Sequence, residues 1–175
     1  MHEPKIGETN EKPREKILHL EIDEVPEVDE FVGRVKDLPI EEQLVEVSKF
    51  IKSNFKNAIS PHTDKLPKEE REKVNRVLRQ EPKTLSGALC LEYGVCVEYH
   101  VLGKAILDKL SIPCKFKKGV VAGSPGHTFL DVQVNGAWQI FDPFAEVYLS
   151  DLGRPDLKRF DPIYYKSSET KKKSG

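Results

Sequence analysis

Three residues of this 175-residue chain have the types that thiol-based acyl transfer requires: Cys96, His127 and Asp142. Cys96 stands at the start of an expected helix, where unpaired N–H groups and the helix dipole favour the thiolate, the form that attacks a carbonyl carbon. Gly94, two residues earlier, would let the chain turn sharply into that helix. His127 could then act as the base and Asp142 as the group that orients it.

A hairpin downstream of Cys96 would bring His127 and Asp142 together. Asn135-Gly136 stands between two apolar runs and predicts a two-residue turn. In that register His127 and Asp142 point to the same face and lie diagonally across the strand pair, about 7–8 Å apart at the backbone. A one-residue bulge would place them on opposite faces, so the prediction depends on the register.

Each of these residues also has an ordinary structural interpretation. Cysteine is among the most buried residue types, and this remains our interpretation of Cys90 and Cys114. A histidine at the start of a strand is commonly structural or exposed, and an aspartate before Pro143 often only begins a turn. The functional interpretation therefore rests on three separate positions that fit one geometric template.

Composition and charge narrow the class of protein. The 28 basic and 29 acidic residues nearly cancel, so bulk charge gives no reason to expect nucleic acid or an anionic membrane as a partner. Three cysteines without framework spacing argue against a disulfide-stapled secreted domain. The N-terminus shows no signal peptide, and no stretch approaches the roughly 20 apolar residues of a membrane helix, so we expect a cytoplasmic protein.

The pattern of apolar residues predicts the elements that position the three candidates. Apolar residues at three- and four-residue steps predict helices at 40–55, 67–80 and 96–110. Alternating or apolar runs predict strands at 16–22, 114–122, 127–134 and 137–142. Residues 24–37 are expected to be irregular because Pro26 would break a regular element. Residues 84–95, with few charges, are expected to form a largely buried loop.

The length fits one domain with tails. Residues 1–15 are polar and are expected to form a flexible arm, and 166–175 form a Lys-rich tail that we expect to be disordered. A single domain would then span 16–165. The oligomeric state is left open.

A family resemblance rests on an ordered set of motifs: Gly94-Val95-Cys96-Val97-Glu98-Tyr99, Ser111-Ile112-Pro113-Cys114, His127-Thr128-Phe129-Leu130-Asp131-Val132, Asn135-Gly136-Ala137-Trp138 and Phe141-Asp142-Pro143. The first two resemble the nucleophile segment of the transglutaminase-like superfamily. The others resemble its histidine strand, hairpin turn and aspartate strand. The resemblance covers roughly residues 84–145. It implies a papain-like α+β fold in which N-terminal helices precede a nucleophile helix packed on an antiparallel sheet.

The resemblance implies a cysteine enzyme that acts on amide or acyl bonds through a Cys-His-Asp triad. The superfamily includes protein cross-linking enzymes, peptidases, peptide N-glycanases and inactive relatives, so the substrate could be a protein, a peptide or a small amide. Val97 replaces the aromatic residue of animal transglutaminases, and no carboxylate cluster resembles a calcium site. The paired zinc-binding cysteines of peptide N-glycanases are absent too. The alternative is a catalytically inactive, protein-binding module of the same fold.

The donors that would stabilise an oxyanion are less clear from the sequence. The backbone N–H of Cys96 is one natural donor. A second donor would come from an upstream side chain, and Gln80, Tyr93 and Asn54 all remain open.

A metal site is a further alternative. Cys90, Cys96, His100 and Cys114 could form an irregular ligand set, since Cys96 and His100 are four residues apart on one expected helix. Structural zinc sites favour closely spaced cysteine pairs, which this set lacks. We therefore expect neither a metal nor another cofactor, and His100 is expected to pack or to lie at the surface.

Overall fold

The computed structural model describes residues 18–121, 124–153 and 165–167. The predicted N-terminal arm, 1–15, lies outside these residues, and so does the predicted tail apart from Lys166 and Ser167. Within the described residues, no helix is long and apolar enough to cross a membrane.

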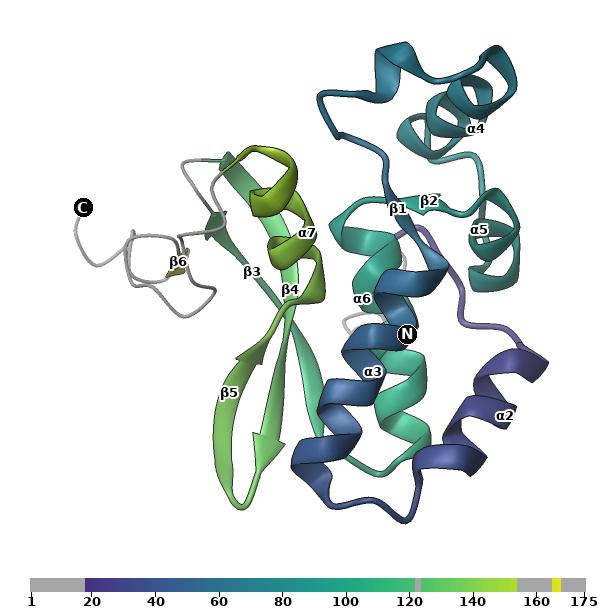
Figure 1. Cartoon of the computed structure of the whole chain (residues 1–175). Helices are drawn as coiled ribbons and strands as arrows, with labels where there is room; N and C mark the ends of the chain where they lie inside the picture. Colours follow the sequence, from purple (N-terminus) through teal and green to yellow (C-terminus); the bar gives the residue numbers. More distant parts are fainter. Residues whose placement is uncertain (1–17, 122–123, 154–164, 168–175) are drawn as a thin grey trace, which may run out of the picture.

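Most of the helices come before the strands of the main sheet along the chain (Figure 1). The α-helices are α2 (Pro26–Val35), α3 (Ile40–Asn54), α4 (Lys68–Leu78), α5 (Leu85–Leu91), α6 (Cys96–Lys109) and α7 (Pro143–Asp151), with a 3₁₀ turn η1 (Thr63–Lys65). The strands are β1 (Lys56–Asn57), β2 (Tyr93–Gly94), β3 (Cys114–Val121), β4 (Ser124–Val134), β5 (Ala137–Phe141) and β6 (Tyr165–Ser167).

The main sheet is antiparallel, with strand order β5-β4-β3-β6, and a separate short parallel pair joins β1 to β2. Helix α6 packs on β4, and α3 packs on α6 (Figure 1). The protein is therefore an α+β fold with the helix that begins at Cys96 lying against the sheet, as predicted.

Helix α6 is buried on most of its circumference. Gly103 lies where α6 meets both neighbours: a Cβ atom there would come within 3.0 Å of Leu130 on β4 and 3.2 Å of Ile51 on α3. Leu102, Ile106 and Leu107 of α6 are fully buried, and burial stabilises such a side chain by about 1.5–3 kcal/mol. The helix is thus held rigidly between the sheet and α3.

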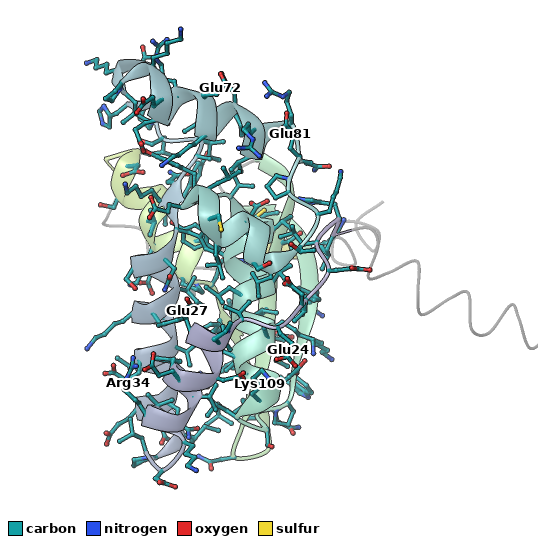
Figure 2. The ribbon with its side chains drawn as sticks, turned by 90° about the vertical axis from the view of Figure 1, so that its right-hand side faces the viewer. Glu24, Glu27, Arg34, Glu72, Glu81 and Lys109 are labelled. Carbon is teal, nitrogen blue, oxygen red and sulfur yellow. The ribbon has the colours of Figure 1, made fainter. Side chains whose placement is uncertain are left out.

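The prediction that residues 24–37 are irregular is wrong, because α2 occupies most of this segment. Pro26 takes the first helical position, where its missing N–H costs nothing. Figure 2 shows Glu27 and Arg34 of this helix labelled on the charged outer surface. The residues that face the core are Val28, Phe31 and Val35.

Two further predictions from the N-terminal half are corrected. Residues 18–22 form only a single bridge, from Glu21 to Thr84, and the positive φ of His19, 55°, is incompatible with a continuous extended strand. The predicted loop at 84–95 contains α5 and β2 instead. Thr84 begins α5 by accepting a hydrogen bond from the N–H of Gly87. At the other end of the chain, Lys166 and Ser167 of the predicted tail belong to β6.

Gly94 is required for close packing. A Cβ atom on it would lie 2.7 Å from Cβ of Glu98 and 3.2 Å from the ring of Phe55. Its φ is not among the positive values of the described residues, so the predicted sharp turn is not the reason for a glycine here. The absence of a side chain lets β2 approach the first turn of α6.

We expect Gly94→Ala to lower the free energy of unfolding by about 1–3 kcal/mol, the usual cost of overpacking. Gly33→Ala is the matched control, because nothing lies within 4 Å of a Cβ there and the position is inside α2. We expect that variant to stabilise the protein by about 0.5–1 kcal/mol. Urea unfolding measures both changes, and equal shifts in the two variants would contradict the packing argument.

Candidate active site

Cys96 is the first residue of α6, and it is half-buried with a free thiol. The start of the helix is held by Glu98, whose Oε1 accepts the backbone N–H of Val95 at 2.8 Å. Glu98 is itself only 1% exposed. The first-turn N–H groups of a helix lack intrahelical acceptors, so the sulfur lies at the positive end of the helix dipole.

The hairpin has the predicted register. Val134 pairs with Ala137 and Leu130 with Phe141, without a bulge between them. Asp142 follows β5 directly and is the N-cap of α7, since its Oδ1 accepts the N–H of Ala145 at 3.0 Å. The predicted strand is one residue too long, and α7 was not predicted.

His127 lies next to both of the other candidates. Its Nε2 is 2.6 Å from Oδ2 of Asp142, and Cys96 is close enough to influence the pKa of the imidazole. Burial on its own lowers the pKa of His127. The hydrogen bonds and charges of Asp142 and Cys96 outweigh that effect and raise this pKa to about 9. The structure thus brings the three predicted residues together and favours the protonated imidazole.

Two aromatic rings stack near the imidazole of His127. The ring of Phe129 stacks at 5.8 Å and that of Phe144 at 6.2 Å between centroids. Phe144 in turn meets Tyr99 edge-on at 4.9 Å. The stacking contacts of Phe129 and Phe144 restrict rotation of the imidazole and keep water from most of its surface, which strengthens its interaction with Asp142.

Asp142 is fully buried. Burial raises the pKa of its carboxyl, but the rings of His100 and His127 outweigh burial and hold this pKa well below its usual range. The carboxylate is therefore ionised inside the protein, and the groups around it stabilise this charged form.

His100 makes a contact that the sequence does not predict. It is fully buried on α6, and its Nε2 lies 3.1 Å from Oδ1 of Asp142, although the ring is not aligned for a good hydrogen bond. Within the described residues its Nδ1 has no hydrogen-bond partner, which costs about 1–3 kcal/mol for a buried polar atom. Its spacing of four residues from Cys96 is the signal that the sequence offers, and this spacing alone fits packing, exposure or metal ligation as well.

The other members of the alternative metal set lie in different settings. Cys90 is exposed on α5, whereas Cys114 begins β3, where burial raises the pKa of its thiol to about 12. Among the residues that the structure describes, no three His, Cys, Asp or Glu side chains are grouped so that they could hold a metal ion.

Of the three side chains left open as oxyanion donors, two have other partners and one is exposed. Asn54 donates to the carbonyl of Phe50 within α3, at 2.8 Å. Tyr93 donates to Glu70 at 2.9 Å, and its ring lines a cavity of about 350 Å³ beside α3, β1 and α7 whose wall does not include Cys96. Gln80 is exposed just beyond α4.

The raised pKa of His127 makes stability depend on pH. The pKa of this imidazole is about 6.5 in the unfolded chain, where the contacts are absent, and about 9 in the folded protein. Its contribution to the free energy of unfolding is therefore complete below pH 6.5 and is lost as the pH rises through 9. We expect the free energy of unfolding to fall by up to about 3 kcal/mol across this range. Urea unfolding at several pH values measures this loss.

His127→Gln should flatten the pH dependence, whereas His62→Gln, at an exposed histidine beside η1, should leave it unchanged. A wild-type protein as stable at pH 9 as at pH 6.5 would contradict the described contacts of His127.

Comparison with known proteins identifies the family. No curated protein matches the chain. Among solved structures it is similar to a candidate cysteine protease from Cytophaga hutchinsonii, with 17% identity and a TM-score of 0.44, over 74% of this chain and 46% of that one. The chain thus spans less than half of that protein. Residues 27–154 match the transglutaminase-like domain family. The chain belongs to the transglutaminase-like domain family.

Proposed function

We propose that this domain is a cysteine-dependent enzyme that acts on amide or related acyl bonds. The observation that carries the proposal is the placement of His127, whose imidazole lies 2.6 Å from Asp142 and whose pKa is raised by both Asp142 and Cys96. This is the order of contacts that a nucleophile, a base and an orienting carboxylate require. The transglutaminase-like family supports the same chemistry.

In the proposed reaction, His127 takes the thiol proton of Cys96. Because Nε2 of His127 faces Asp142, Nδ1 is the nitrogen left for the thiol. The thiolate attacks the carbonyl carbon of the substrate and forms a tetrahedral intermediate. The intermediate collapses by breaking the C–N bond, and the leaving amine takes the proton from His127. The product on the protein is a thioester at Cys96.

Asp142 stabilises the imidazolium form of His127 and holds the ring in one orientation. The backbone N–H of Cys96, at the start of α6, is the donor that we assign to the oxyanion. Asn54, Tyr93 and Gln80 are weaker candidates for a second donor, because the first two donate elsewhere and the third is exposed.

The thioester is resolved by attack of an acceptor on its carbonyl carbon. Water as the acceptor gives a peptidase or a deamidase, and an amine gives protein cross-linking. In each case His127 removes a proton from the acceptor and returns it to the sulfur of Cys96. The substrate that we propose is a protein or peptide, with a small amide as the other option.

We expect iodoacetamide at mildly acidic pH to alkylate Cys96 about tenfold or more faster in the folded protein than in urea, because the imidazolium stabilises the thiolate. Cys90 is the internal control: it is exposed on α5, and we expect it to react at an ordinary thiol rate. Peptide mass spectrometry separates the sites. If Cys96 reacts no faster than Cys90, the proposed activation is wrong.

We expect turnover of glutamine-containing peptides or other amides to be abolished in Cys96→Ala while the fold persists. Asp142→Asn should lower kcat by as much as about 10⁴-fold, the scale seen when a triad carboxylate is removed, and asparagine can still cap α7. Release of ammonia or new peptide ends indicates water as the acceptor, and incorporation of a labelled amine indicates cross-linking. Residual turnover in Cys96→Ala would exclude Cys96 as the nucleophile.

A further inference from the structure

We propose that His100 is a positioning residue of this site, which holds the carboxylate of Asp142 ionised and in the plane that His127 needs. The inference deepens the proposed function and rests on it for its catalytic meaning. The contact between His100 and Asp142 is a property of the fold, however, and it can be tested separately from catalysis.

The first argument is the way in which Asp142 is held. Its Oδ2 faces Nε2 of His127 at 2.6 Å, and its Oδ1 receives the N–H of Ala145 at 3.0 Å and lies 3.1 Å from Nε2 of His100. Both carboxylate oxygens are therefore engaged. Rotation of the carboxylate about its Cβ–Cγ bond would break contacts on both sides, so His100 helps to fix the acceptor that orients His127.

The second argument is the burial of His100 itself. Both His100 and Asp142 have no exposed side-chain surface. The ring of His100 stands nearly perpendicular to that of His127, with centroids 6.1 Å apart and an interplanar angle of 86°. An apolar residue could fill this space without burying two ring nitrogens, so packing alone does not explain a histidine here. Its polar contact is the carboxylate of Asp142.

The third argument is placement on the nucleophile helix. His100 lies one turn after Cys96, so the two side chains are on neighbouring positions of the same face of α6. Helix α6, which presents the thiol of Cys96, therefore also contacts Asp142, the carboxylate that orients His127. The titratable groups that lie against Asp142 include His127 from β4 and His100 from α6, while Glu98 of α6 accepts the N–H of Val95 and lies 3.5 Å from His19.

The consequence concerns the ionisation of Asp142. Without the His100 ring, the buried carboxylate loses one of the groups that favour its charged form, so it takes up a proton at a higher pH. A protonated Asp142 no longer stabilises the imidazolium of His127, and the thiolate of Cys96 loses its counter-ion. The acid limb of the pH profile, in which the reaction rate of Cys96 falls as the pH is lowered, should therefore move to higher pH.

The test uses three variants of the full chain. His100→Phe removes both ring nitrogens at similar volume, and His100→Gln retains an amide donor that can take the place of Nε2–H. Tyr99→Phe is the matched control: Tyr99 is an equally buried residue of α6 whose hydroxyl donates to Phe55 at 2.8 Å. Circular dichroism and urea unfolding establish that each variant is folded.

The first readout is the rate of Cys96 alkylation by iodoacetamide as a function of pH. At acidic pH we expect the alkylation of Cys96 to be about tenfold slower in His100→Phe than in the wild type. Losses of this size are typical when a residue that orients a functional side chain is removed, as for the partners of metal-binding histidines. The pH profile of Cys96 alkylation should be close to that of the wild type in His100→Gln and the same as that of the wild type in Tyr99→Phe. A folded His100→Phe variant with the wild-type profile would overturn the proposal.

The second readout is the titration of the Asp142 carboxyl carbon by NMR, in protein labelled at aspartate. We expect its protonation to move to higher pH in His100→Phe and to stay near the wild type in His100→Gln. This measurement does not depend on the reactivity of Cys96. If Cys96 proves unactivated in the wild type, the proposed function fails, while an unchanged Asp142 titration overturns the role of His100. If His100→Phe does not fold, the smaller His100→Leu takes its place, and an unchanged Asp142 titration in that folded variant overturns the role of His100.

A double-mutant cycle separates action through Asp142 from a general loss of packing. In an Asp142→Asn background, His100→Phe should have no further effect on the acid limb, because the group through which it acts is gone. Additive losses in the double variant would show that His100 acts independently of Asp142 and would overturn the proposal.

Discussion

The ionised carboxylate of Asp142 is the constraint on which the site depends. Taking such a group out of water costs several kcal/mol, and the cost must be offset by donors and positive charge around it. The groups around it come from different elements: the rings of His127 from β4 and of His100 from α6, and the N–H of Ala145 from α7. The sheet and two helices must therefore meet at this point for the carboxylate to remain buried and charged.

Helix α6 connects this charge to the rest of the fold. Its first residue presents the thiol, its second turn carries His100, and further along Gly103 allows close contact with β4 and α3. A second buried carboxylate, Glu98, holds the first turn through the N–H of Val95. Because the helix is fixed at its start and along its length, the thiol has little freedom relative to His127. A preorganised arrangement of this kind is what the proposed chemistry requires.

Local sequence patterns predicted much of this arrangement. Asn135-Gly136 determines a two-residue turn through its own backbone preferences, and the turn sets the register that places His127 beside Asp142. The apolar spacing of α3, α4 and α6 likewise predicts helices, because one face of each is buried. These features depend on residues close together in the chain, and they sufficed to nominate the three candidate residues.

Other features were decided only by the tertiary structure. Helix α2 has an acidic, proline-initiated sequence, and it becomes recognisable as a helix through the burial of Phe31 in a core built from distant segments. The partner of His100 is Asp142, 42 positions later in the numbering, and the sequence contains no local signal for that contact. The sequence by itself determined which groups could do thiol chemistry and how the hairpin aligns two of them. Only the tertiary structure decided what neutralises the buried carboxylate, because burial and long-range electrostatics arise when α6, β4 and α7 pack together.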